Sequence, residues 1–302
     1  RGGWVRRWWG ALHQMCRGGL AVISVHDPEL IPAALIARLA TRVPVVVDVH
    51  EDVPAQMRTK AWLPRGLRPA VAWTAARLLG MAERFATITL AEPNYRHLFR
   101  RDHPVLPNYP AAGSLPPPAR DEGYLVYVGD VTEERGALDM VEAAGLLAEK
   151  RTLRLVGRCP QELGERLQRR ARELGLGLDL LGPLPHRQAM EVVAGAAAGF
   201  CLLHDLPNYR DSLPTKVIEY LEMGVPVLAT DLPGTRTATS GSEGVFLVAP
   251  GDAPAAASAL RAALADGAAR RAATAQARVL REAMVWPEEE VRRVYLAAAA
   301  VM

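Results

Sequence analysis

The stretch YLVYVGDVTEERGALDMVEAAGLLAEKRTLRLVG, residues 124–157, decides the fold class of this 302-residue chain. Unbroken apolar runs at its two ends, 124–129 and 152–157, are typical of strands that are covered on both faces. Between them, residues 135–150 have the apolar spacing of an amphipathic helix. A strand, a helix and a second strand in this order predict a βαβ unit in a parallel sheet.

The same alternation continues along most of the chain. Further apolar runs lie at 20–26, 43–50, 85–90, 178–182, 199–204, 225–230 and 244–248, and helix-length amphipathic segments separate them. We therefore predict an α/β protein built from doubly wound, Rossmann-like parallel sheets.

A proline-rich segment, PNYPAAGSLPPPARDEG at 107–123, divides the strands into two groups and has the composition of an interdomain linker. We predict an N-terminal domain over 1–117, a C-terminal domain over 118–284, and a helix over 285–302 that packs back on the N-terminal domain. The first group has three strands and the second has six. We therefore expect the N-terminal domain to be incomplete, lacking at least one βαβ unit of about 30 residues. Truncation is favoured over a degenerate domain.

Composition excludes several classes of protein. The net charge is +3, and all but three of the 36 basic residues are arginines, which alternate with glutamate in amphipathic segments. This pattern predicts a solvated surface and no nucleic-acid binding. The three cysteines are far apart and have no zinc-like spacing, so we expect no disulfide framework, no structural zinc and a cytoplasmic location.

The N-terminal segment WVRRWWGALHQMC, residues 4–16, carries Trp4, Trp8, Leu12 and Met15 on one helical stripe. Such a stripe packs against a core or lies in a membrane interface. The sequence leaves both readings open, the second of which implies peripheral contact with the inner face of the cytoplasmic membrane. No apolar run is long enough for a transmembrane helix.

The stretch NYRDSLPTKVIEYLEMGVPVLATDLPG, residues 208–234, carries the chemistry. We expect Asp211 or Ser212 to cap a helix on which Lys216 and Glu219, three residues apart, share one face. A helix N-terminus with a nearby lysine favours phosphate, and an acidic residue one turn further can accept hydrogen bonds from ribose hydroxyls. An ordinary surface ion pair is the alternative.

This stretch resembles the donor-site motif of the GT-B glycosyltransferases of family 4, which retain the anomeric configuration. The motif has two acidic residues separated by seven others and then a Gly-x-Pro-Val turn. Asp211 and Glu219 match the pair, with aspartate in place of the usual glutamate. The resemblance implies that Glu219 binds the ribose of a nucleotide-sugar and that Asp211, Ser212 and Leu213 contact the sugar and phosphate.

Two other segments extend the resemblance over most of the chain. In GDVTEERG, residues 129–136, Gly129 and Arg135 match positions that face the diphosphate, whereas Asp130 stands where many members have arginine. HDPEL (26–30) and DVHEDVP (48–54) end two N-terminal strands. By resemblance, His50 touches the transferred sugar or its phosphate, and the residues nearer the acceptor are His26, Asp27 and Glu51.

The resemblance implies a metal-independent, retaining glycosyltransferase of hexosyltransferase type. It would use an NDP-sugar as donor substrate and no cofactor, and its acceptor would be a glycan, lipid or small molecule in glycoconjugate or cell-surface polysaccharide biosynthesis. Arg135, Lys216 and His50 are the expected catalytic residues, and no metal ligands are expected. Two alternatives stay open: a catalytically weak GT-B-like subunit that stabilises an active partner, and a sugar epimerase of the same fold.

Overall fold

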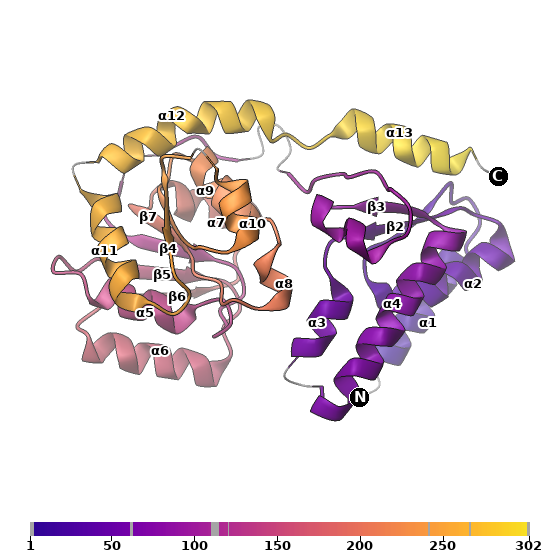
Figure 1. Cartoon of the computed structure of the whole chain (residues 1–302), viewed down its shortest axis with the longest axis horizontal. Coiled ribbons are helices and arrows are strands. Elements are labelled where there is room, and N and C mark those ends of the chain that lie inside the picture. The colour runs from indigo at the N-terminus through magenta and orange to yellow at the C-terminus, as the bar shows by residue number, and fades with distance from the viewer. Residues whose placement is uncertain are drawn as a thin grey trace. The chain divides into compact units, whose positions relative to one another are not determined.

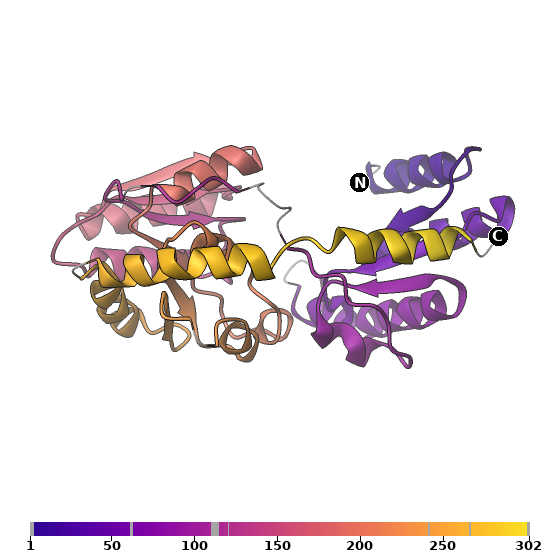
Figure 2. The same ribbon diagram turned by 90° about the horizontal axis from the view of Figure 1, so that it is seen from above.

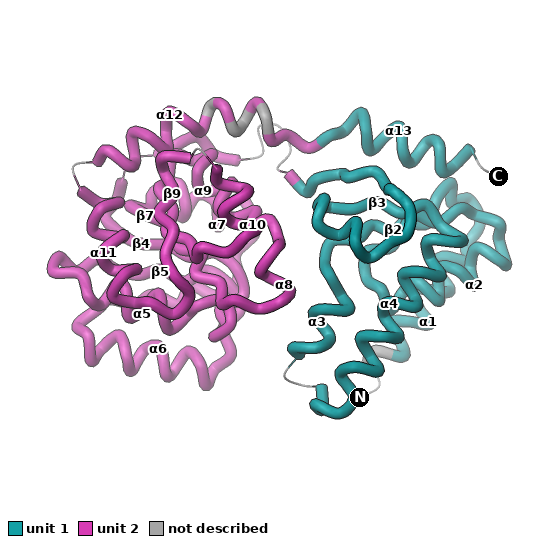
Figure 3. Tube along the Cα trace, viewed as in Figure 1, with its two compact units in different colours: residues 1–108, 287–302 teal, residues 109–286 magenta. Residues whose placement is uncertain are grey.

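The computed structural model describes residues 3–60, 63–109, 115–119, 121–240, 242–265 and 267–300 (Figure 1). The chain divides into two compact units (Figure 3). Unit 1 consists of Arg1–Asn108 and Pro287–Met302, and unit 2 consists of Tyr109–Trp286. Each unit is built on a parallel sheet with helices packed against it, which confirms the predicted α/β fold class.

Unit 1 has a three-stranded parallel sheet in the order β1-β2-β3. Its strands are β1 (Ile23–Val25), β2 (Val45–Val49) and β3 (Thr87–Leu90), and each lies within a predicted apolar run. Its α-helices are α1 (Gly3–Met15), α2 (Ile31–Thr41), α3 (Val53–Thr59), α4 (Arg68–Phe85) and α13 (Glu288–Ala299). Short 3-10 helices occur at η1 (Pro28–Leu30), η2 (Arg65–Leu67) and η3 (Pro93–Leu98).

Alternate residues of β2 face opposite sides of the sheet, as in any strand. Val45, Val47 and Val49 join a core with apolar residues of α2 and α4. On the opposite side, the hydroxyl of Ser24 lies 2.9 Å from the Tyr295 hydroxyl of α13. The last described helix of the chain therefore packs on the sheet of unit 1, along which it runs in Figure 2.

The amphipathic helix α1 uses its stripe for packing. Leu12 is buried in the core of unit 1, and Trp8 and Met15 pack against that core. The side chain of Trp4, the remaining member of the stripe, lies outside the described residues. Within the described part of the chain, no helix combines the length and the apolar character needed to cross a bilayer.

A buried acid ties the end of α4 to the segment that follows η3. The Glu83 carboxylate accepts hydrogen bonds of 2.9 Å from the backbone N–H groups of Arg100 and Arg101, and lies 3.1 Å from His103 Nε2. Burial acts to raise the pKa of Glu83, but these hydrogen bonds outweigh it and hold the pKa below its ordinary value. The charge is therefore stable in the interior because three polar groups contact its Oε1 atom.

Unit 2 has a six-stranded parallel sheet in the order β6-β5-β4-β7-β8-β9. Its strands are β4 (Leu125–Val128), β5 (Leu153–Val156), β6 (Leu178–Gly182), β7 (Ala198–Cys201), β8 (Val227–Thr230) and β9 (Val245–Val248). All lie within predicted runs except β7, which begins one residue before its run. Its α-helices are α5 (Ala137–Gly145), α6 (Gln161–Glu173), α7 (His186–Ala194), α8 (Pro207–Arg210), α9 (Thr215–Glu222), α10 (Pro233–Ala238), α11 (Ala253–Leu264) and α12 (Ala268–Ala283).

Helices cover both faces of this sheet. One apolar cluster joins the strands to α5, α6 and α11, and a second joins them to α7, α9 and α12. The chain proceeds from β4 outward to β6 and then returns to place β7 on the other side of β4. The strand order therefore reverses between β4 and β7, and α/β proteins bind ligands at such a switch point, beyond the carboxyl ends of the strands.

Candidate functional site

The loops that follow β4 and β7 meet at the switch point of unit 2. Gly136 has a φ of 77°, and a Cβ placed on it would lie 2.1 Å from the carbonyl oxygen of Leu202. The backbone N–H of His204 donates to the carbonyl of Glu134 over 2.9 Å. Only glycine allows this close approach, so residue 136 fixes the course of the loop that carries Arg135.

Two cationic groups converge on Gly129, which comes directly after β4 and has a φ of 139°. A Cβ at this position would lie 3.0 Å from the Nζ of Lys216 and 3.3 Å from a guanidinium nitrogen of Arg135. The sum of these distances puts the two nitrogens at most 6.3 Å apart. The structure thus brings Lys216 of α9 close to Gly129 and Arg135, which both belong to the earlier segment 129–136.

Tyr220 of α9 explains how Lys216 reaches the end of β4. Its hydroxyl accepts a 2.8 Å hydrogen bond from the backbone N–H of Val128. The ring fits because residue 199 is glycine, since a Cβ there would lie 2.3 Å from a ring carbon. One turn earlier on α9, Lys216 Nζ lies 4.6 Å from the ring centre of Tyr127 and 3.4 Å from its hydroxyl.

The predicted cap of this helix is wrong. The helix α9 begins at Thr215, the residue before it is Pro214, and no side chain caps it. Ser212 is turned back toward α8, because both its N–H and its hydroxyl bond to the carbonyl of Tyr209. Asp211 ends α8 instead of starting α9.

The segment Asp211–Leu213 passes close to the first turn of α10. A Cβ on Gly234 would lie 2.4 Å from the carbonyl oxygen of Ser212 and 2.8 Å from that of Asp211. Gly234 therefore lets the two backbones touch, and the predicted sugar-contacting residues are held by backbone packing.

Glu219 lies one turn beyond Lys216 on α9 and is partly buried. Within the described ranges, no side chain or backbone group forms a hydrogen bond with its carboxylate. Burial raises the pKa of Glu219, while His186 and Lys216 act in the opposite direction. A carboxylate that is partly desolvated and has open acceptor positions is suited to bind hydroxyl groups.

Asp130 stands where the resembled family has a basic residue, and its charge is compensated. Arg158 donates to both carboxylate oxygens, over 3.0 and 3.2 Å, and lowers the pKa of Asp130. Arg158 also borders a hollow of about 760 Å³ that lies between α6 and the ends of β5 and β6. That hollow does not include Gly129, Arg135 or Lys216.

In unit 1, the four residues predicted from HDPEL and DVHEDVP surround one cavity. His26, Asp27, His50 and Glu51 line a space of about 160 Å³ at the carboxyl ends of β1 and β2. Asp52 caps α3 by accepting from the N–H of Ala55. The cluster in unit 2 and this cavity belong to different units of the chain.

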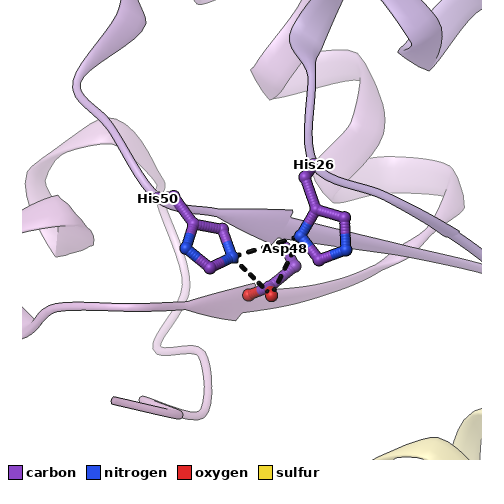
Figure 4. Close-up of side chains that lie close together, drawn as sticks. All are labelled: His26, Asp48 and His50. Atoms are coloured by element: carbon purple, nitrogen blue, oxygen red, sulfur yellow. Dashed lines mark hydrogen bonds and ion pairs between the residues drawn. The ribbon is translucent and has the colours of Figure 1, made fainter. Parts of the chain in front are cut away.

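The structure places Asp48, which was not among the predicted site residues, between the two histidines (Figure 4). Its Oδ2 lies 2.7 Å from His50 Nε2 and 3.3 Å from His26 Nδ1, and its Oδ1 accepts from Thr89 over 2.7 Å. Burial acts to raise the pKa of Asp48, but hydrogen bonds from His50 and Thr89 hold it below its ordinary value. The same bond to Asp48 raises the pKa of His50. The spacing Asp-x-His was the available signal, because alternate strand residues share a face.

Comparison with known proteins agrees with this geometry. Residues 122–266, which include the Gly129 cluster and the acidic pair, match the family model described as glycosyl transferases group 1. The match covers a little under half of the chain. The predicted resemblance to GT-B glycosyltransferases is confirmed, and the assignment to family 4 stays a prediction.

Individual proteins are also similar to this chain, in sequence or in fold. Over 117 residues the chain is 30% identical to TuaC of Bacillus subtilis, a protein to which teichuronic acid biosynthesis is attributed. That match spans 39% of this chain and only 27% of TuaC. Sucrose-phosphate synthase of Thermosynechococcus elongatus superposes with a TM-score of 0.73 at 18% identity, over 98% of this chain and 76% of the synthase.

A second solved structure is HepE of Anabaena in complex with UDP and glucose. It superposes with a TM-score of 0.72 at 14% identity, over 99% of this chain and 82% of HepE. These likenesses confirm the GT-B fold.

Proposed function

We propose that this chain is a retaining glycosyltransferase of family 4 that moves a sugar from an NDP-sugar to an acceptor hydroxyl. The observation that carries the proposal is the convergence of Lys216 and Arg135 on Gly129 at the switch point of a group 1 domain. Two cations above a residue without a side chain leave room for the phosphates of a nucleotide to approach the backbone.

The proposed chemistry follows from the charge that develops on the leaving diphosphate. Arg135, Lys216 and the uncapped N-terminus of α9 provide fixed positive charge there. Loss of one well-placed donor costs about 2.7–4 kcal/mol of transition-state stabilisation, or a factor of about 10²–10³ in kcat. With this charge supplied by side chains, departure of the diphosphate requires no metal ion.

The remaining donor contacts belong to the acidic pair. In this proposal, the open carboxylate of Glu219 accepts hydrogen bonds from the ribose hydroxyls. Asp211, Ser212 and Leu213, held against α10, contact the sugar and its phosphate. The complexes of HepE with UDP and with UDP-glucose support a nucleotide-sugar as the donor.

On the acceptor side we propose the cavity of unit 1, with His50 toward the transferred sugar and His26, Asp27 and Glu51 toward the acceptor. The match to TuaC supports a role in cell-surface polysaccharide or related glycoconjugate biosynthesis. Because Cys16, Cys159 and Cys201 are free thiols, we place the protein in the cytoplasm. Contact with the inner face of the membrane would use the face of α1 on which Val5 and Trp9 are exposed.

Asp130 favours a second candidate function, that of a catalytically weak GT-B-like subunit which stabilises an active partner. A carboxylate beside the diphosphate position opposes anion binding, although Arg158 compensates its charge. The two functions differ in whether the chain alone releases NDP.

The test is a panel of UDP-, GDP- and ADP-sugars with candidate acceptors, in which NDP release is measured for the wild type and for Glu219→Ala and Lys216→Ala. We expect Glu219→Ala to raise the KM for the donor and Lys216→Ala mainly to lower kcat. Arg187→Ala, which removes an exposed cation paired only with Glu191, is the matched control. The anomeric configuration of the product, read by NMR, tests retention.

Wild-type kinetics in both site variants would show that the site assignment is wrong. Absence of NDP release with every donor, together with measurable UDP binding, would favour the non-catalytic subunit.

A further inference from the structure

We propose that His26, Asp48 and His50 in unit 1 form a binding site for one divalent transition-metal ion of the Zn²⁺ class. One ligand atom from each residue lies within 4.8 Å of the others. The three side chains point toward a common centre, two from the ends of neighbouring strands and one from within β2 (Figure 4). Metal binding at this site does not depend on the proposed glycosyl transfer and is tested separately from it.

The distances between the ligand atoms lie within about 0.6 Å of those around a tetrahedral metal. Zinc bonds to imidazole nitrogen and carboxylate oxygen of about 2.0–2.2 Å put neighbouring ligand atoms about 3.3–3.6 Å apart. Here His26 Nδ1 lies 3.3 Å from Asp48 Oδ2 and 3.1 Å from His50 Nε2. The third edge, from His50 Nε2 to Asp48 Oδ2, is 2.7 Å and must open by about 0.6 Å to admit the ion.

Hydrogen bonding alone satisfies at most two of the three contacts in this triangle. A carboxylate only accepts, and each ring nitrogen carries either one proton or one lone pair. If both nitrogens donate to Asp48, two N–H groups face each other over 3.1 Å, which is unfavourable. If only His50 donates, its N–H is shared between Asp48 Oδ2 and His26 Nδ1, and these two acceptors face each other over 3.3 Å. A metal ion turns all three contacts into favourable ones, because each atom then binds it through a lone pair.

Neighbouring residues hold the ligands in place, as in established metal sites. Thr89, which pairs with Asp48 across the sheet, donates to Oδ1 and leaves Oδ2 directed at the histidines. The Tyr95 hydroxyl donates to the carbonyl of His50 over 2.9 Å. Both supports come from outside the triangle, so the arrangement does not depend on the ion to order it.

The ligand set selects the class of ion. Two imidazoles and one carboxylate suit zinc and related transition metals, whereas magnesium and calcium prefer sites made of oxygen. Three protein ligands leave a fourth position for water or an exogenous oxygen. Both imidazoles line the 160 Å³ cavity, and the acidic Asp27 and Glu51 line it as well. A cation is therefore favoured there by charge.

The experiment measures metal binding by the whole chain after treatment with EDTA and removal of the chelator. Titration with Zn²⁺ by calorimetry should give one site with a Kd in the micromolar range or below. Co²⁺ in its place should produce the visible absorption of a tetrahedral complex. His26→Ala and His50→Ala should each weaken Zn²⁺ binding at least 100-fold, and Thr89→Val should weaken it about 10–100-fold.

His97→Ala is the matched control, because His97 is an exposed histidine of the same unit paired with Asp52 outside the triangle. Since the His26 side chain is 56% exposed, its variant is expected to fold, and circular dichroism checks this. Zn²⁺ binding that is absent, that survives in His26→Ala, or that falls equally in His97→Ala would overturn the proposal. A failure of glycosyl transfer with intact Zn²⁺ binding would refute only the proposed function.

Discussion

Replacement of Lys216 by methionine separates ligand binding from fold stability. Methionine keeps an unbranched side chain beside Tyr127 but removes the charge that faces Arg135 across Gly129. In the absence of a nucleotide, this change relieves repulsion between two cations. In the presence of a nucleotide, it removes one of the groups proposed to bind the diphosphate.

The magnitude follows from the upper limit of 6.3 Å between the two nitrogens. At that distance, two like charges repel by about 2.6 kcal/mol with an effective dielectric constant of about 20, and by about 0.7 kcal/mol in bulk water. The lost contact of the ammonium with Tyr127 offsets about 0.5–1 kcal/mol of this gain. The attraction of Lys216 to Glu219 and Asp130 is lost as well, so we expect the free energy of unfolding to change by no more than roughly 2 kcal/mol. One lost charged hydrogen bond to phosphate weakens UDP binding by about 1.5–3 kcal/mol, or roughly 10–150-fold.

Urea unfolding without ligand and calorimetric titration with UDP measure the two effects on the same preparation. Arg187→Met, which removes an exposed cation of α7, is the control and should change neither quantity appreciably. A Lys216→Met protein that is clearly less stable and yet binds UDP as tightly as the wild type would refute the reasoning. It would show that Lys216 has only a structural role.

Three further substitutions test the framework around these sites. Tyr220→Phe leaves the N–H of Val128 without its hydrogen bond. We expect the free energy of unfolding in urea to fall by about 1–3 kcal/mol and UDP binding to weaken. Intact UDP affinity would contradict the role of Tyr220 in positioning α9. Gly136→Ala places a methyl group 2.1 Å from the Leu202 carbonyl, and its melting temperature should fall by several degrees; an unchanged value would refute the close approach. Glu83→Gln should cost about 1–3 kcal/mol at pH 7 in denaturant unfolding. The pKa of Glu83 is lower in the folded state than in the unfolded state. The stability that its charge confers is therefore present above the unfolded pKa of about 4.3 and is lost as the pH falls through the folded pKa. The difference in unfolding free energy between wild type and variant should accordingly shrink in acid.

The sequence predicted the strands of both sheets better than it predicted the ends of the helices. Strands in a parallel sheet are buried on both faces, so each appears as an unbroken apolar run whatever its neighbours are. The start of α9 depended instead on Tyr209, whose carbonyl takes both polar groups of Ser212. A competing acceptor of this kind, formed by another short helix, is not visible in the local sequence.

In the candidate sites, too, local relations between residues were predictable and long-range contacts were not. Lys216 and Glu219 were predictable as neighbours because they are three residues apart on one helix. The approach of Lys216 to Gly129 was not predictable. It depends on the hydrogen bond that the Tyr220 hydroxyl accepts from the N–H of Val128 and on the absence of a side chain at Gly199. Asp48 lies within an apolar run that predicts a strand, and the Asp-x-His spacing to His50 was its available signal.

The return of α13 to unit 1 has a consequence for how the chain is made. The Ser24 hydroxyl finds its partner on Tyr295, 271 residues later, after all of unit 2. At about 5–20 residues per second, a ribosome needs roughly 9–36 s to synthesise residues 109–286. Throughout that interval the sheet of unit 1 lacks the helix α13 that packs on it. Vectorial synthesis therefore leaves this early sheet as the surface that chaperones have most time to meet.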